Sequence, residues 1–189
     1  IAAELLSITL TKRGAHQGGD IPMCGVPFHA SEVYLERLIK AGYKVAICEQ
    51  LETPQEAKKR GYNALVRREV VRIITPGTIV EDSLLDPAQP GYLCSISVGK
   101  KTNSAALGWA DISTGEVFVT MSHVQGLANM LASINPRELI ASAEITKGDL
   151  LSTALVEYHK VLSLRPPHIF AEKACRERVL DFYQLQSLA

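Results

Sequence analysis

The amino-acid sequence predicts an α/β protein made of two mixed α/β domains, over residues 1–80 and 91–189, with a linker at 81–90. The chain has 189 residues, which is long for one domain and suits two of roughly 80–110 residues each. Hydrophobic residues make up 47% of it, an ordinary share for a chain that forms a core. Prolines, acids and glycine gather between Glu81 and Gly91, and this mixture is typical of a linker.

The first domain is expected to alternate short helices, strands and loops. Its predicted elements are a helix end at 2–6, an extended stretch at 8–11, a polar loop at 12–20, an extended or turning segment at 21–29, a helix at 31–41, a strand at 45–48, a short helix at 54–60 and a strand at 65–75. Ser31 is expected to cap the first full helix, and Gly42 to end it. The apolar stripe of that helix consists of Tyr34, Leu35, Leu38 and Ile39.

The short helix and the strand after it carry a local excess of positive charge. Thr53 and Glu56 have the spacing of a capping box, with Pro54 at the first helical position. Six Lys or Arg fall between Lys58 and Arg72, against Glu69 alone, although the whole chain balances 20 basic and 20 acidic residues. Such an excess could neutralise phosphates. A solvated helix end beside a charged strand edge explains the count equally, and composition alone favours that alternative.

The second domain begins with three strands and then alternates helices with strands. The predicted elements are strands at 92–98, 105–112 and 116–121, a helix at 124–134, a strand at 138–142, a helix at 149–158, a strand at 161–164 and a helix at 171–183. Three antiparallel strands followed by alternating helices and strands is the order of a ribonuclease-H-like sheet.

Several kinds of chemistry lack the residues they need. The segment Gly99–Thr102 resembles a phosphate-binding Walker A loop only faintly, because Lys101 stands where Ser or Thr is required. A ribonuclease-H-like nuclease needs carboxylates around two metal ions, yet the strand at 92–98 has none, and Asp111 and Glu116 fit a turn better. The five histidines stand apart. We therefore expect no catalytic residue, no metal site and no cofactor in these residues.

Cysteine usage and hydropathy indicate an intracellular protein. Cys24, Cys48, Cys94 and Cys175 are far apart among small or apolar neighbours, so buried, reduced thiols are expected. The sequence shows no signal peptide and no apolar run near 18 residues, and we expect a cytoplasmic protein without membrane contact. It opens as if inside a structure, which suggests a fragment of a longer protein.

Two short segments of the first domain could contact another molecule. Lys12 and Arg13 directly precede Gly14, where the backbone can approach a ligand closely. Met23 lies in a rigid apolar loop between two prolines and could wedge against stacked bases. The alternative is that Met23 fills the core and that the two cations end a solvated strand; these residues alone favour it.

Longer blocks of sequence resemble a known family. Five of them resemble consecutive segments of the MutS mismatch-binding domain, in the family's order: Ser7–Gly14, Ile21–Ala30, Tyr34–Leu38, Val45–Gln50 and Arg67–Thr78. Beyond the linker, Asp111–Gly115 and Asn135–Leu139 fit the connector domain of that family, which has a ribonuclease-H-like fold.

The resemblance implies recognition of mispaired or unpaired bases in duplex DNA, the first step of mismatch repair. It places Lys12 and Arg13 near backbone phosphates, Met23 in a minor-groove loop and His29 just after it. The family's Phe-Tyr-Glu signature is expected upstream of Ile1, and the chain is expected to stop inside the connector. For the parent protein the resemblance implies a homodimer, an ATPase domain further along that uses ATP and Mg, and a MutL-type partner bound through the connector.

Two other functions remain open at this point. The chain could be a protein-interaction module in which the connector half acts and the first half does not bind DNA. A ribonuclease-H-like nuclease is the other alternative, which the missing carboxylates disfavour.

Overall fold

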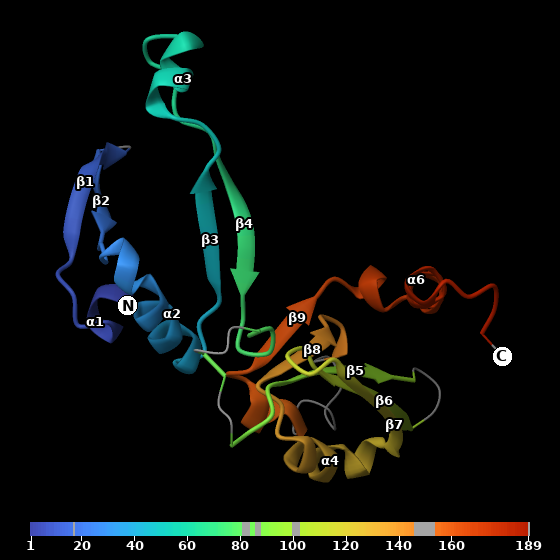
Figure 1. Cartoon of the computed structure of the whole chain (residues 1–189). Helices are drawn as coiled ribbons and strands as arrows, with labels where there is room; N and C mark the ends of the chain where they lie inside the picture. Colours follow the sequence, from blue (N-terminus) through green and yellow to red (C-terminus); the bar gives the residue numbers. More distant parts are fainter. Residues whose placement is uncertain (17, 81–83, 86–87, 100–102, 146–153, 189) are drawn as a thin grey trace. The chain divides into compact units, whose positions relative to one another are not determined.

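A computed structural model describes residues 1–16, 18–80, 84–85, 88–99, 103–145 and 154–188. The chain forms two compact units (Figure 1). The first contains Ile1–Pro76 together with Leu84, and the second contains 77–80 and the chain from Leu85 onward. Residues 81–83 and 86–87 of the expected linker lie outside the described residues.

The described part of the first unit contains two separate antiparallel strand pairs and three short α-helices. Its elements are α1 (Ala2–Leu5), β1 (Thr11–His16), β2 (Gly19–Met23), the 3-10 helix η1 (Phe28–Ala30), α2 (Ser31–Lys40), β3 (Val45–Gln50), α3 (Pro54–Lys59) and β4 (Arg68–Ile74). Strand β1 pairs with β2, and β3 pairs with β4. The β3/β4 pair is a ribbon with α3 at its end (Figure 1).

Several local predictions for this unit need correction. Within the polar loop predicted at 12–20, residues 12–16 and 19–20 belong to the paired strands β1 and β2, because the backbones of the two segments pair with each other; residue 17 lies outside the described residues. Ser31 is the first residue of α2 rather than its cap, since η1 runs directly into the helix and Ala30 occupies the cap position. The strand expected at 65–75 is shorter, Arg68–Ile74. Cys48, expected to be buried, is exposed.

The second unit is built on one five-stranded mixed sheet. Its elements are β5 (Tyr92–Val98), β6 (Ser104–Asp111), β7 (Glu116–His123), η2 (Val124–Gly126), α4 (Leu127–Ile134), β8 (Glu138–Ser142), η4 (Val156–Tyr158), β9 (Leu162–Arg165), η5 (Pro167–Phe170) and α6 (Glu172–Tyr183). The strand order is β7-β6-β5-β8-β9. The first three strands are antiparallel, while β8 runs parallel to β5 and β9 parallel to β8.

The core of this unit lies between the sheet and α4. Fully buried side chains from both layers meet there, including Cys94, Ile96, Leu107, Leu127, Leu131 and Leu139. Asn135 ends α4 in the left-handed conformation, with a φ of 48°. Of the helix predicted at 149–158, residues 149–153 lie outside the described residues, and the last three form η4.

Candidate nucleic-acid interface

The β1/β2 hairpin carries three of the four residues that the sequence singled out. Thr11 pairs with Met23 and Lys12 with Pro22, but the register then shifts by one residue. Arg13 and Gly14 together face Ile21, which makes this position a β-bulge. Gly14 has a φ of +66°, a conformation that glycine adopts without steric cost. Glycine is therefore required here by the bulge that presents Arg13.

The two cations of the hairpin differ in their surroundings. The Lys12 ammonium donates to the Asp20 carboxylate at 2.7 Å, and both side chains are exposed. Arg13 is also exposed and, within the described residues, its guanidinium has no hydrogen-bond or ion-pair partner. Arg13 is therefore the more available of the two for an anionic ligand.

Met23 lies at the end of β2 and is not core filler. Its side chain is 41% exposed, and Ile21, two residues earlier on the same face of the strand, is 46% exposed. The Thr11 hydroxyl donates to the Met23 carbonyl at 2.8 Å, which fixes the backbone at this point. A partly exposed apolar side chain thus lies on the same hairpin as Lys12 and Arg13.

His29 is not part of this hairpin. It lies in η1, six residues beyond Met23, and is exposed. Its neighbour Phe28 is 90% exposed, an apolar side chain that the sequence analysis did not single out.

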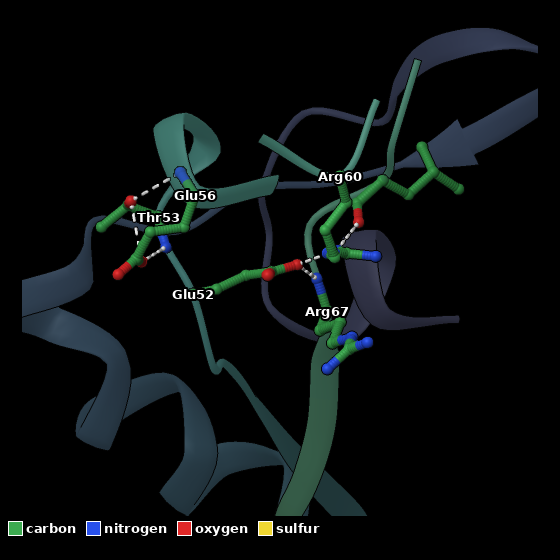
Figure 2. Close-up of polar contacts among 6 residues, drawn as sticks. Glu52, Thr53, Glu56, Arg60 and Arg67 are labelled. Carbon is green, nitrogen blue, oxygen red and sulfur yellow. Dashed lines mark hydrogen bonds and ion pairs between the residues drawn. The ribbon is translucent and has the colours of Figure 1, made fainter. Parts of the chain in front are cut away.

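A second basic region lies at the end of the β3/β4 ribbon, in residues 51–67, which we call the tip loop. The Glu52 carboxylate lies at its centre, where it accepts hydrogen bonds from the Arg60 guanidinium and, at 2.7 Å, from the Arg67 backbone N–H (Figure 2). Arg60 also donates to the Leu65 carbonyl at 2.9 Å. The N–H of Leu51 donates to the Arg67 carbonyl at 3.0 Å and closes the loop.

The capping box predicted at Thr53 and Glu56 is present in this loop. The Thr53 hydroxyl accepts from the Glu56 N–H at 3.2 Å, and the Glu56 carboxylate accepts from the Thr53 N–H at 2.8 Å (Figure 2). This backbone hydrogen bond from Thr53 lowers the pKa of Glu56. The backbone hydrogen bond from Arg67 lowers the pKa of Glu52, and the bonds from Arg60 act in the same direction.

The cations of the tip loop are visible in the sequence, but the hydrogen bonds that organise them are not. Glu52 and Arg67 are 15 residues apart, so local sequence gives no sign of their contact. Tyr62 and Leu65 were also missed, and they are 92% and 84% exposed. Their exposure depends on the loop's conformation, which the sequence pattern does not specify.

Among the described residues, no three or more His, Cys, Asp or Glu side chains lie together as a possible metal site. A search of the same residues finds no helix whose length and apolarity would let it span a membrane.

The fold and these surfaces define a two-domain α/β protein whose first domain presents basic loops. Comparison with family models is more specific: MutS domain I matches residues 1–83, and MutS domain II matches residues 91–189. The chain therefore belongs to the MutS family of DNA mismatch-repair proteins.

Individual relatives agree with this assignment. The DNA mismatch repair protein MutS of Rickettsia bellii is 44% identical over 189 residues, which is 100% of this chain and 21% of the relative. The protein of the same name from Wolbachia pipientis is 44% identical over 187 residues, or 99% of this chain and 22% of the relative. That of Rickettsia typhi is 42% identical over 189 residues, with 100% and 21% covered. The chain spans about a fifth of the length of these relatives.

Proposed function

We propose that this chain takes part in recognising mispaired or unpaired bases in duplex DNA, the first step of mismatch repair. The β1/β2 hairpin is the observation that carries the proposal. It carries the partly exposed Met23 on the same two strands as the exposed Arg13 and Lys12, within the region that matches MutS domain I. His29 is proposed as an additional contact from η1, after the hairpin.

The proposed mechanism separates affinity from selectivity. Cations near phosphates supply affinity by releasing counterions, irrespective of sequence. An apolar side chain inserted at a base step costs about a few kcal/mol of lost stacking, which the larger contact with a bent duplex offsets. A mispaired step is easier to kink than a paired one, so the same wedge costs less there. Selectivity would then come from deformability rather than from hydrogen bonds to base edges.

We further propose the division into domains at 1–80, 81–90 and 91–189, with a ribonuclease-H-like second domain; residues 77–80 then end the first domain in sequence while they pack with the second compact unit. The strand order β7-β6-β5-β8-β9, with its three antiparallel strands first, supports this fold. The whole protein is proposed to be a cytoplasmic homodimer whose ATPase, with ATP and Mg, lies in a domain other than the two matched here. These residues themselves are proposed to be non-catalytic.

A second candidate function is protein interaction through the connector half, with a MutL-type partner. A hollow on one face of the five-stranded sheet favours this second function. A shallow hollow of about 460 Å³ lies over β5, β6 and β7, and its lining includes Ser95, Ser97, Ala106, Gly108, Val119 and Met121. Val119 and Met121 are 82% and 75% exposed, so apolar side chains border a floor of small residues.

The nuclease alternative is weaker because the carboxylate of Asp111, the last residue of β6, is engaged in hydrogen bonds within the protein. Its carboxylate accepts from the Ser113 hydroxyl at 2.6 Å, from the Ser113 N–H at 2.9 Å and from the Gly91 N–H at 3.2 Å. The hydrogen bond from the Ser113 hydroxyl is the main cause that lowers the pKa of Asp111. These bonds use the carboxylate oxygens to hold the end of β6.

The proposed function is tested by removing both hairpin cations. We compare the unmutated chain, called the parent chain below, with Lys12→Gln/Arg13→Gln on two duplexes over a series of salt concentrations. One duplex is fully paired and the other has a single G·T mismatch. The unmutated chain should prefer the mismatched duplex. The variant should bind both duplexes more weakly, and its salt dependence should fall by about one for each lost phosphate contact.

The matched control is Lys160→Gln/Lys173→Gln, which removes two exposed lysines from the second unit. Unchanged binding in the hairpin variant, equal to that of the control, would favour the interaction module. Equal affinity of the parent for both duplexes would reject mismatch recognition by this chain.

A further inference from the structure

The tip loop carries a net positive charge, and the proposed function, which uses the cations of the β1/β2 hairpin, gives these residues no role. Residues 51–67 contain four Lys or Arg and two carboxylates, a net charge of +2 in a chain whose formal net charge is zero. Charge concentrated in one loop creates a local potential that a balanced total conceals.

Both carboxylates of the tip loop are already engaged within it. Glu52 accepts from Arg60 and from the Arg67 backbone, and Glu56 accepts from both the backbone and the hydroxyl of Thr53. Lys58 and Lys59 are exposed and, in the part of the chain that the structure describes, neither has a hydrogen-bond or ion-pair partner. The two carboxylates therefore organise the loop, and the two lysines remain available to an external anion.

The loop is also held in one conformation before any ligand binds. The N–H of Leu51 donates to the Arg67 carbonyl at the base of the loop. Arg60 and the Arg67 backbone donate to Glu52, and the capping box fixes the start of α3 (Figure 2). A loop that is already ordered loses less conformational entropy on binding, so weak contacts can yield measurable affinity. The alternative explanation of the charge excess, a solvated helix end beside a charged strand edge, does not require this hydrogen-bond network.

Tyr62, three residues after Lys59 in the sequence, adds a second kind of exposed group to the tip loop. Its side chain is 92% exposed, so the fold does not use it for packing. Tyrosine and lysine are both among the side chains that bind the sugar and phosphates of DNA, whatever the base sequence. A loop that carries both exposed cations and an exposed tyrosine thus matches a nucleic-acid backbone better than it matches an apolar partner.

We propose that the tip loop is a second DNA contact, which binds the sugar-phosphate backbone of the duplex through Lys58 and Lys59. The ligand is the duplex of the proposed function, on which this inference rests. The contact is independent of base sequence and of the mismatch. It adds affinity to both kinds of duplex and leaves the choice between them to the hairpin.

The test uses the full chain with Lys58→Gln/Lys59→Gln, and fluorescence anisotropy on the fully paired duplex over a series of salt concentrations. The variant should bind several-fold more weakly at low salt. The slope of log affinity against log salt should become shallower by about one for each lysine that contacts a phosphate. The ratio of affinities for mismatched and paired duplex should not change.

The control is again Lys160→Gln/Lys173→Gln, which removes the same charge from the second unit. Circular dichroism of both variants checks that they fold as the parent does. Acetylation of lysines with and without duplex gives an independent readout on the unmutated chain. Lys58 and Lys59 should be protected by DNA, while Lys160 and Lys173 should not.

The outcomes separate this inference from the proposed function. A salt slope equal to that of the control, or no protection of Lys58 and Lys59, would overturn the tip-loop contact whatever the mismatch preference. A shallower slope in a chain that binds both duplexes equally would support the tip loop and reject mismatch recognition. A parent chain that binds no duplex at the lowest salt would overturn both.

Discussion

The ammonium group of Lys12 lies 2.7 Å from a carboxylate oxygen of Asp20, across the β1/β2 hairpin. Lys12 pairs with Pro22, so Asp20 is its diagonal neighbour on the same face. The side chains are 71% and 57% exposed, and such pairs stabilise a protein by about 0.2–1 kcal/mol at most. The main effect of Asp20 is therefore on the charge that the hairpin presents to a ligand.

Asp20→Asn is expected to strengthen binding to duplex DNA by a few-fold at low salt, because it frees Lys12 and removes a negative charge from the hairpin. The free energy of unfolding should change by less than about 1 kcal/mol. Anisotropy at two salt concentrations measures the first effect, and urea unfolding the second. Asp181→Asn on α6 makes the same change in net charge in the second unit. An equal gain in both variants would mean that total charge, and not the hairpin, sets the affinity.

The tip loop should lose its ordered conformation as the pH falls into the acid range. Hydrogen bonds from the Arg67 backbone to Glu52 and from the Thr53 backbone to Glu56 lower the pKa of each carboxyl. A lowered folded-state pKa means that the contribution to stability is complete above the ordinary glutamate pKa. It is lost as the pH falls through the lowered value.

The backbone amide of Arg67 reports this transition directly. Its NMR signal should shift as Glu52 takes up a proton and the hydrogen bond breaks, at a pH below that at which a glutamate with the ordinary pKa titrates. Glu52→Gln should abolish that pH response, since the side chain no longer titrates. An Arg67 amide in the unmutated chain that titrates at or above the ordinary glutamate pKa would contradict the lowered pKa.

Sequence predicted the local features of this protein better than the contacts between distant segments. The capping box at Thr53 and Glu56 follows from four adjacent residues, and the structure confirms it. The strand Glu138–Ser142 was predicted with its observed bounds, because a buried parallel strand is a short, largely apolar run between turn signals. Both features are encoded within a few residues.

The hairpin and the tip network were missed for the opposite reason. The segment at 12–20 is polar and contains glycine, which predicts a loop, and only pairing with a second strand makes it β1 and β2. Glu52 bonds a backbone group 15 residues away, a contact that no periodicity reveals. Lys12 and Lys58 were both visible in the sequence as cations. The sequence did not show that Asp20 pairs with Lys12, or that Lys58 has no ion-pair partner among the described residues.

Gly77 should tolerate no side chain. A Cβ at this position would lie 2.7 Å from the Cβ of Glu138 and 3.0 Å from Cδ1 of Leu93, in the packed interior of the second unit. Gly77→Ala is therefore expected to lower the free energy of unfolding by about 1–3 kcal/mol, as overpacking does elsewhere. Urea unfolding measures it, with Gly91→Ala as the control, because a Cβ there meets nothing within 4 Å. Equal stability of the two variants would show that the contact at Gly77 relaxes without cost.

Met23 is expected to set mismatch preference rather than total affinity. Its side chain is uncharged and therefore forms no ion pair with a phosphate. Inserted between bases, it would cost less stacking energy at a base step that kinks easily. Met23→Ala should therefore reduce the ratio of mismatched to paired affinity by roughly fivefold, equivalent to a loss of about 1 kcal/mol. The salt slope should not change, because no cation is removed.

Met121→Ala provides the matched control, since Met121 is 75% exposed on β7 and belongs to the second unit. It removes the same side chain and should leave both the ratio and the salt slope as in the parent. If Met23→Ala weakens binding to both duplexes equally, the methionine adds general contact area instead of selecting the lesion. The next residue of this chain to substitute would then be Phe28, an apolar side chain that is 90% exposed beside His29.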